Sequence, residues 1–402
     1  MNYTIVGGGI AAFAALKAIR QLDPHAHVTV INEEEHCFYY RPMTPLVVKG
    51  DRERDEILSD ERIPEFHRLH DRAVSLDTAT RSIALRQGGS HSFERLLIAT
   101  GSSPVIPDIP GIHEKNIYYL RTLTDATKLR EAAKKAKKAV VLGGGLVGIK
   151  QAVALNHLGI EVTVVEKEAC ILQPRLDREG AEIIAGKLKE KGIRLLLGES
   201  ITEIGAEGRK VRLASGETIA TDLVCIAVGV KPNLAWLSGS GLAIDRALVV
   251  DEKMETNVAG IYAAGDVVQS KDMVTGKTMV SGLWTNAVDM GRTAGTNMAG
   301  GKLKYAGSLE IMNATEIERV AFISVGNILA EGNGIDIVRH RRNNDVYRKL
   351  IFKDDILTGA VFLGDVTNAG IYTALIKSGM PLGHLKEKAI QSTLNYADCC
   401  MR

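Results

Sequence analysis

The chain has 402 residues, of which 45% are hydrophobic and 24% charged, and its formal net charge is +2. This length predicts two or three domains, and the balanced charge excludes a long-range field that attracts nucleic acid or a membrane surface. No uncharged run reaches the roughly 18 apolar residues of a membrane span. The five cysteines lack CxxC or CxxH spacing, which argues against a disulfide framework or a metal site. We therefore expect a cytoplasmic protein without metal.

Residues 3–35 and 139–168 share one pattern of strand, glycine-rich turn, apolar helix, second strand and acid. Their turns, GGGIAA and GGGLVG, match G-x-G-x-x-G/A. The first glycine of this motif permits a tight turn, the second lets the backbone approach a pyrophosphate, and the third small residue allows close packing. Unpaired N–H groups at the start of the helix then face the phosphates. The chain therefore predicts two βαβ dinucleotide sites.

The acid after each second strand discriminates between cofactors. Glu166 ends the second unit, and a carboxylate there accepts hydrogen bonds from a ribose 2′-OH and repels a 2′-phosphate, which favours NAD(H) over NADP(H). The equivalent position in the first unit is Asn32, followed by Glu33. We expect Glu33 to bind the ribose, with Asn32 as the alternative. Two dinucleotides in one chain are typical of a flavoprotein that exchanges hydride with a nicotinamide.

Three further segments, residues 96–104, 225–233 and 256–268, each contain an apolar strand followed by a turn with glycine. With the two turns, this order resembles the FAD- and NAD-dependent pyridine nucleotide–disulfide oxidoreductase superfamily over nearly the whole chain. The resemblance implies an α/β fold with two Rossmann-like βαβ dinucleotide-binding domains and a small C-terminal α/β domain. It implies these boundaries: FAD-binding domain, residues 1–112 and 244–315; NAD-binding domain, residues 113–243; C-terminal interface domain, residues 316–402.

The same resemblance implies the cofactor contacts, residue by residue. The FAD contacts are Gly7, Gly9, Ala11, Ala12, Asn32, Glu33, Arg41, Pro42, Val74, Ala99, Thr100, Gly101, Gly265, Asp266, Trp284, Thr285 and Ala287. The NAD contacts are Gly143, Gly145, Leu146, Val147, Gly148, Glu166, Val228 and Gly229. N–H groups at the helix start near Trp284 are expected to stabilise negative charge on reduced flavin. The alternative for Trp284 is a core aromatic residue.

Two residues are expected near the reacting ring, Lys150 and Arg41. Many relatives carry a glutamate, often paired with a lysine, where this chain has Lys150 and Leu46. A lysine near the flavin would stabilise the anionic reduced ring or contact NADH. The alternative is that Lys150 lies along the helix surface.

The stretch FYYRPMTPLVVKG, residues 38–50, resembles rubredoxin, ferredoxin and nitrite reductase-type flavoproteins. Other segments resemble the flavin subunits of phenylglyoxylate dehydrogenase and tungsten aldehyde oxidoreductase. The resemblance implies an FAD-dependent NADH:acceptor oxidoreductase whose partner is rubredoxin, ferredoxin, or an iron–sulfur or tungsten subunit of a larger aldehyde or 2-oxoacid oxidoreductase complex. One alternative is an NADH oxidase or a small disulfide or peroxide reductase that uses Cys37. Another is a flavin-binding structural or signalling module.

Cys37 is the residue on which the first alternative depends. The active cysteine of thiol-using relatives aligns near Pro42, so Cys37 is expected to face the adenosine half or solvent, with His36 as the group that would lower its pKa.

The C-terminal segment is expected to form two strands around Asp354-Asp355, then a helix closed by Gly379. It is expected to form a homodimer interface or to dock a partner subunit. Cys399 and Cys400 are interpreted as a reduced tail, with a swinging redox arm as the alternative.

Overall fold

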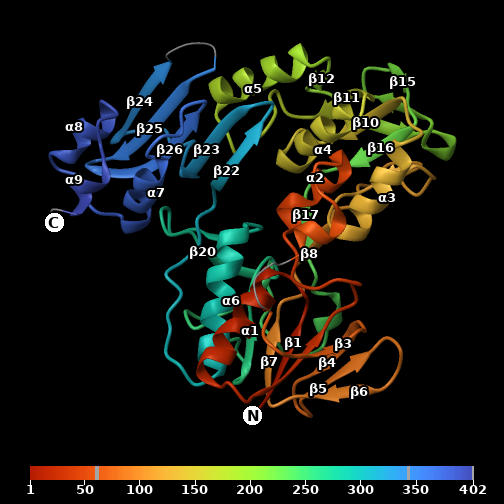
Figure 1. Cartoon of the computed structure of the whole chain (residues 1–402), viewed down its shortest axis with the longest axis vertical. Helices are drawn as coiled ribbons and strands as arrows, with labels where there is room; N and C mark the ends of the chain where they lie inside the picture. The colour runs from red at the N-terminus through yellow and green to blue at the C-terminus, as the bar shows by residue number, and fades with distance from the viewer. Residues whose placement is uncertain (59–62, 342–344, 401–402) are drawn as a thin grey trace. The chain divides into compact units, whose positions relative to one another are not determined.

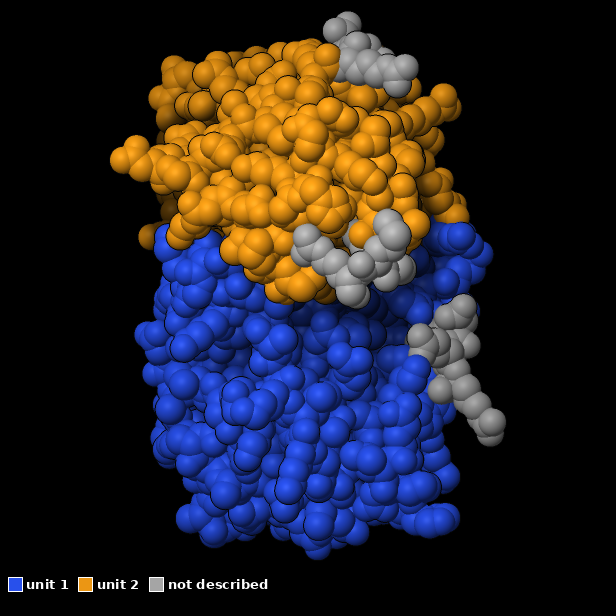
Figure 2. Space-filling model, turned by 90° about the vertical axis from the view of Figure 1, so that its left-hand side faces the viewer, with its two compact units in different colours: residues 1–44, 52–103, 230–308 blue, residues 45–51, 104–229, 309–402 orange. Residues whose placement is uncertain are grey.

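The computed structural model describes residues 1–58, 63–341 and 345–400, the last two of these without their side chains. The chain forms two compact units, which Figure 2 colours separately. Unit 1 comprises Met1–Thr44, Arg52–Ser103 and Val230–Ser308. Unit 2 comprises Pro45–Asp51, Pro104–Gly229 and Leu309–Arg402.

Unit 1 is built on a five-stranded parallel sheet in the order β19-β7-β1-β2-β3. Its strands are β1 (Asn2–Val6), β2 (His27–Ile31), β3 (His67–Leu69), β7 (Arg95–Ile98) and β19 (Ile261–Ala263). Helix α1 (Ile10–Leu22) connects β1 to β2, so the first predicted βαβ unit is confirmed. Nearly all of the apolar side chains of β1, β2 and β7 are buried, as expected for a parallel sheet covered on both faces.

Helix α6 (Trp284–Met298) lies beside α1 in Figure 1, and the two helices touch backbone to backbone. A Cβ atom on Gly291 would lie 2.1 Å from the carbonyl oxygen of Ala11, and one on Gly295 would lie 2.4 Å from that of Ala15. Only glycine permits this approach, because any larger side chain would push the two helices apart. The start of α6 is therefore held at a fixed position relative to the start of α1.

Smaller elements complete unit 1. They are the antiparallel strands β4 (Ala73–Asp77), β5 (Ser82–Leu85) and β6 (Ser90–Ser92), the group β18 (Leu248–Val249), β20 (Val268–Lys271) and β21 (Thr278–Val280), and the short helices η1 (Arg41–Met43), η2 (Arg54–Ile57) and η4 (Ala235–Leu237). Strand β8 (Ser102–Pro104) pairs with β17 (Val230–Pro232) where the chain leaves and re-enters the unit. Helix α2 (Thr44–Lys49) follows η1, and its residues after Thr44 belong to unit 2.

Unit 2 contains a second five-stranded parallel sheet, in the order β12-β11-β10-β16-β9. Its strands are β9 (Ile117–Tyr118), β10 (Lys138–Leu142), β11 (Glu161–Glu166), β12 (Arg194–Leu197) and β16 (Leu223–Ile226). Helix α4 (Leu146–His157) connects β10 to β11, which confirms the second predicted βαβ unit. The remaining helices here are α3 (Leu123–Ala133), α5 (Arg178–Glu190) and η3 (Ala206–Gly208).

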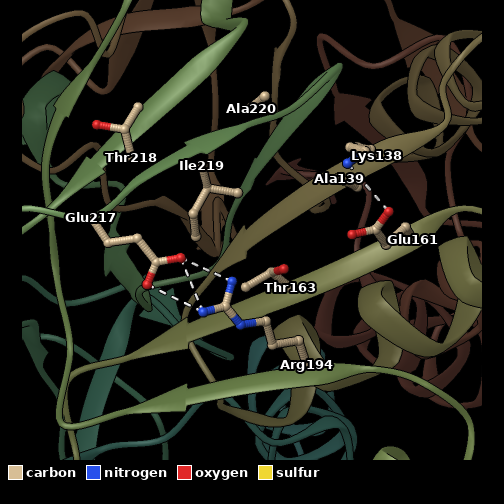
Figure 3. Close-up of a pocket in the computed structure, with 9 residues that line it drawn as sticks. All are labelled: Lys138, Ala139, Glu161, Thr163, Arg194, Glu217, Thr218, Ile219 and Ala220. Carbon is tan, nitrogen blue, oxygen red and sulfur yellow. Dashed lines mark hydrogen bonds and ion pairs between the residues drawn. The ribbon is translucent and has the colours of Figure 1, made fainter.

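One face of this sheet packs on the antiparallel strands β13 (Ile201–Ile204), β14 (Lys210–Leu213) and β15 (Thr218–Ala220). A small hollow lies where this layer meets the amino-terminal ends of β10, β11 and β12 (Figure 3). Its rim carries two ion pairs, Lys138–Glu161 at 3.4 Å and Arg194–Glu217 at 3.0 Å. Nucleotides bind at the opposite, carboxyl-terminal edge of such sheets, so this hollow is not a dinucleotide site.

The C-terminal part of unit 2 is an antiparallel sheet in the order β22-β23-β26-β25-β24. Its elements are β22 (Met312–Ile317), β23 (Val320–Gly326), β24 (Ile335–Arg341), β25 (Tyr347–Lys353), β26 (Ile356–Leu363), α7 (Ala369–Ser378), α8 (Leu385–Ile390) and α9 (Tyr396–Cys400). The predicted turn at Asp354-Asp355 and the predicted helix end at Gly379 are confirmed. The expected boundary between residues 315 and 316 falls inside β22. The side chains of Cys399 and Cys400 lie outside the described part.

A buried ion pair joins this sheet to helix α5. The Asp177 carboxylate accepts hydrogen bonds from the Gly180 N–H (3.2 Å), which caps α5, and from the Tyr347 hydroxyl (2.7 Å). Its second oxygen also lies 3.2 Å from Lys349 Nζ, which donates to the Ile328 carbonyl at 2.9 Å. Burial and the bond to Asp177 raise the pKa of Tyr347. One carboxylate thus caps a helix and pairs two groups of the neighbouring sheet.

We expect Asp177→Ala to lower the free energy of unfolding by about 3 kcal/mol or more, because it leaves the Lys349 ammonium buried without a counter-charge. The control is Arg178→Ala, which breaks an exposed ion pair with Glu182 and should cost less than about 1 kcal/mol. Urea unfolding followed by circular dichroism measures both. Equal effects of the two variants would contradict a stabilising role for the buried pair.

Candidate functional site

The first glycine of each turn is required by the fold itself. Gly7 and Gly143 have φ angles of +117° and +108°, in the region that favours glycine. A Cβ atom on Gly7 would lie 2.2 Å from the carbonyl oxygen of Ala99, and one on Gly143 would lie 2.4 Å from that of Ala227. Each turn therefore presses against the end of the neighbouring parallel strand. At the third position of the second turn, a Cβ on Gly148 would lie 1.9 Å from the Gly143 carbonyl oxygen.

The second glycine of each turn is not required by the polypeptide. Gly9 and Gly145 have extended conformations, with φ angles of −87° and −72°, that any residue adopts. A Cβ atom on either would meet no atom within 4 Å. The open space in front of them is what a pyrophosphate needs to approach the backbone. The residues present therefore fit a dinucleotide at each turn.

Helices α1, α4 and α6 begin without a side-chain N-cap. The N-cap residues of α1, α4 and α6 are Gly9, Gly145 and Leu283; they provide no side-chain hydrogen bond, and no acid stands in these first turns. By contrast, Thr122 caps α3 and Asp177 caps α5. Uncapped helix starts attract anions. The uncapped starts of α1, α4 and α6 coincide with predicted cofactor contacts, and α7 and α8 also start without a side-chain cap.

Glu166 lies against the second turn. Its carboxylate accepts hydrogen bonds from the Gly144 N–H at 2.5 Å and from the Glu168 N–H at 2.9 Å. These bonds hold it rigidly at the carboxyl end of β11, where a ribose is bound in such folds. Lys167, beside it, is exposed and lies 3.8 Å from the Glu168 carboxylate.

Asn32 occupies the corresponding place at the first turn. A Cβ on Gly8 would lie 2.8 Å from the Asn32 side chain, just as one on Gly144 would lie 3.1 Å from Glu166. Asn32 is buried and donates to the Glu34 carbonyl at 3.0 Å. Glu33 points to the surface and pairs with Arg72 at 3.5 Å. The structure thus brings Asn32, the alternative ribose contact, to the turn and leaves Glu33 outside it.

The mouth of the second turn is apolar. Val147, in the first turn of α4, is 48% exposed, and Val228, just after β16, is 39% exposed. Leu146 is half-buried beside them, and Gly229 follows with a φ of +110°. Exposed apolar side chains at the carboxyl edge of a parallel sheet suit the flat rings of a nucleotide.

Arg41 is held by two groups that the sequence interpretation missed. Its guanidinium pairs with the Glu34 carboxylate and donates to the Tyr39 hydroxyl at 2.7 Å. Tyr39 in turn donates to Glu34 at 2.6 Å. Burial acts to lower the pKa of Arg41, but Tyr39 and Glu34 outweigh it and raise the pKa. The only hint in the sequence was the spacing of Glu34, Tyr39 and Arg41, which reveals no partnership without the fold.

Asp266 and the start of α6 lie in the same unit. The Asp266 carboxylate accepts a hydrogen bond from the Ser102 hydroxyl at 2.8 Å and adds to the electrostatic stabilisation of Arg41. Gly265 has a φ of +85°, and its Cβ would lie 3.3 Å from that of Ala11. Trp284 is half-buried and stacks on Tyr40, with ring centroids 5.5 Å apart. Trp284 is therefore not a core residue.

The loop after β7, which contains Ala99, Thr100 and Gly101, is clamped by Asn233. Asn233 donates its amide N–H to the Thr100 carbonyl at 2.8 Å, and its side-chain oxygen accepts from the Ser103 hydroxyl at 2.7 Å. The sequence signal for Asn233 was its position at the end of GVKPN, which follows an apolar strand.

The remaining predicted FAD contacts also lie in unit 1. Ala12 and Ala287 are buried, Thr285 is half-buried, and Pro42 is exposed in η1. Val74 is 43% exposed on β4.

Comparisons with known proteins agree with this geometry. Residues 1–291 match the model of the family described as pyridine nucleotide-disulphide oxidoreductase. The chain belongs to this family. Residues 311–380 match the rubredoxin NAD+ reductase C-terminal domain. Membership gives the chain an oxidoreductase activity and FAD and NAD(H) as cofactors, as predicted.

Individual relatives cover nearly the whole chain. The NADH-dependent phenylglyoxylate dehydrogenase subunit epsilon of Aromatoleum evansii is 33% identical over 98% of this chain and 95% of its own length. The crystal structure of NADH:rubredoxin oxidoreductase from Clostridium acetobutylicum has a TM-score of 0.79 at 27% identity, covering 98% of this chain and 99% of that chain. An NAD-dependent persulfide reductase from A. fulgidus has a TM-score of 0.89 at 27% identity, covering 96% of this chain and 79% of that chain.

Cys37 lies in surroundings that do not activate a thiol. Its side chain is half-buried, packs against the core of unit 1, and accepts a hydrogen bond from the Asn32 amide at 3.3 Å. Burial raises the pKa of Cys37. The lowered pKa considered for Cys37 beside His36 is not found, because loss of hydration outweighs the neighbouring groups that favour the thiolate. The structure places Cys37 against Asn32 and the core of unit 1, and its orientation toward the adenosine half stays a prediction.

Neither a metal site nor a membrane span is found in the described part of the chain. No group of three or more His, Cys, Asp or Glu side chains there could hold a metal ion. No helix within the same residues is long and apolar enough to cross a bilayer.

The glycine geometry predicts opposite results for two substitutions. Gly9→Ala should fold normally but lose FAD, because the new methyl group fills the space that the pyrophosphate needs. Gly7→Ala should instead lower the free energy of unfolding by about 2 kcal/mol or more, because of positive φ and the clash with Ala99. The measurements are flavin content after purification and urea unfolding. Full FAD occupancy in Gly9→Ala would contradict the assignment of the first turn.

The second turn offers the matched experiment. Gly145→Ala should keep its FAD and weaken NAD+ binding roughly tenfold, a difference that calorimetric titration resolves. A variant that loses FAD and retains NAD+ would show that the two turns serve the opposite cofactors.

Proposed function

We propose that this protein takes hydride from NADH onto FAD and passes the electrons on to a protein redox partner. The observation that carries the proposal is the presence of two open glycines, Gly9 and Gly145, in separate parallel sheets. Each is unnecessary for the polypeptide and is explained by a dinucleotide. One dinucleotide stays as the flavin cofactor, and the other comes and goes as the nicotinamide substrate.

We propose that unit 1 binds FAD and that the parallel sheet of unit 2 binds NAD(H). In unit 1 the N–H groups of α1 hold the pyrophosphate, Asn32 lies nearest the ribose position, and Asp266 with Ser102 offers polar contacts. The positive end of the α6 dipole, at a start that Leu283 does not cap with its side chain, favours a negative charge on the ring. In unit 2, Glu166 orients the adenine ribose and Val147 covers the rings. FAD, when bound, accepts a hydride and releases electrons singly.

A protein acceptor is favoured over a small disulfide by the state of Cys37. A thiol enzyme needs an exposed thiolate, whereas this thiol is half-buried with a raised pKa. The match of residues 311–380 to a rubredoxin reductase C-terminal domain supports a carrier protein or an iron–sulfur or tungsten subunit as the partner. We propose that the C-terminal sheet supplies this interface, or that of a homodimer.

The runner-up is a reductase of persulfides, disulfides, peroxide or oxygen, which the similarity to a persulfide reductase supports. A flavin-binding module with little turnover is the remaining alternative. Stopped-flow mixing of the oxidised holoprotein with NADH, without oxygen, separates that module from both enzymes. We expect the flavin band near about 450 nm to bleach. Its persistence would leave only the structural module.

Acceptor specificity then separates the two enzymes. We expect rapid reoxidation by a rubredoxin, a ferredoxin or a viologen, and slow reoxidation by oxygen or a disulfide. Because the Cys37 thiol is not activated, Cys37→Ser should change the rate with the protein acceptor by less than about twofold. Disulfide reduction by the wild type that is lost in Cys37→Ser would contradict the proposed transfer of electrons to a protein partner. Cys170→Ser, at a half-buried thiol outside the first turn, is the matched control.

A further inference from the structure

Lys150 lies on the helix that starts at the second glycine turn. It is in the second turn of α4, and Leu146 and Val147 precede it by four and three residues. Residues with these spacings share one face of a helix. Long side chains in a helix lean back toward its amino end. We therefore expect the ammonium group of Lys150 to lie over the first turn of α4, at the mouth of the proposed NAD(H) site.

Lys150 has no ion-pair partner among the described residues. Among these residues its ammonium group forms no ion pair within 4.0 Å and no hydrogen bond. Lys138 and Lys187, in contrast, are paired with Glu161 and Asp345 at 3.4 Å and 2.9 Å. Lys150 is also half-buried, and this burial lowers its pKa. A partly buried cation without a partner is costly, which marks it as a candidate functional group.

We propose that Lys150 makes the nicotinamide site bind NADH more tightly than NAD+. The inference rests on the proposed function, since it requires the coenzyme to bind at the start of α4. NADH and NAD+ share every group except the nicotinamide ring, which is neutral in NADH and positively charged in NAD+. The proposal places the nicotinamide ring against Val147 and next to Lys150, where a cation repels only the oxidised form. At an effective protein dielectric constant of about 20, the repulsion between the lysine and a nicotinamide charge within about 7 Å weakens binding of NAD+ relative to NADH roughly tenfold or more.

The consequence is resistance to product inhibition. After hydride transfer the product is NAD+, and the repulsion from Lys150 speeds its release. The site then stays available to NADH in a pool where NAD+ is in excess. A lysine that contacted only the pyrophosphate would not have this effect, because that group is the same in both forms.

The test compares two ligands on the oxidised holoprotein by calorimetric titration. One is NAD+, and the other is the tetrahydro analogue of NAD, whose ring is neutral but donates no hydride. In the wild type we expect the analogue to bind roughly tenfold more tightly. In Lys150→Gln the ratio should fall close to one, through tighter binding of NAD+. In the matched control Lys167→Gln, at an exposed lysine beside Glu166, the ratio should not change.

A pH series on the wild type provides an independent readout. Lys150 repels NAD+ only while protonated, so the preference should be present at neutral pH and lost as pH rises through its lowered pKa. The loss should come below the ordinary lysine value of about 10.4. It should be absent in Lys150→Gln. If that variant fails to fold, the wild-type pH series decides alone.

The possible failures are distinguishable. Binding of both ligands by the wild type with the same ratio in Lys150→Gln overturns this inference and leaves the proposed function intact. Equal weakening of both ligands in that variant also overturns it, and assigns Lys150 to the pyrophosphate. Failure of the wild type to bind either ligand removes the proposed function together with the inference.

Discussion

The contact between each glycine turn and the end of the adjacent parallel strand is the constraint on which the rest of the molecule depends. Gly7 presses on Ala99 and Gly143 on Ala227, at distances that exclude a Cβ atom. This contact fixes the direction of α1 and of α4. The first N–H groups of each helix therefore lie at the carboxyl edge of its own sheet. In unit 1 the constraint extends further, because α6 touches α1 through Gly291 and Gly295. A third uncapped helix start is thereby fixed in the same unit.

Helix starts differ in whether a side chain caps them. The starts of α3 and α5 are closed by the side chains of Thr122 and Asp177, whereas α7 and α8 also start without a side-chain cap. The helix ends at the two turns are left open, and their N-cap residues are the glycines whose missing side chains have no other explanation. Asp177 shows the opposite extreme, since one buried carboxylate serves a helix cap, a tyrosine and a lysine together. Such a fully satisfied group stabilises a fold but cannot bind anything else.

The chemistry that the chain omits is as informative as the chemistry it supports. Its first cysteine is half-buried against a core, with a raised pKa, so it does not provide a reactive sulfur beside the flavin. Hydride transfer between two cofactors needs no such group and depends on placement and charge. The two proposals therefore concern the same site at two levels: which cofactors the turns hold, and how one lysine ranks the two redox forms of the nicotinamide.

The sequence by itself determined both βαβ units, the glycine turns, the cofactors and the C-terminal strands and helix, because turn chemistry and apolar periodicity are local signals. Only the tertiary structure decided that Asn32 rather than Glu33 meets the first turn, that Glu34 and Tyr39 hold Arg41, and that burial sets the pKa of Cys37. Asn233 and Thr100, or Asp177 and Lys349, are far apart in the chain, and no local pattern records their pairing. Hydration and hydrogen-bond partners are properties of the packed molecule, so they are defined only once the chain has folded.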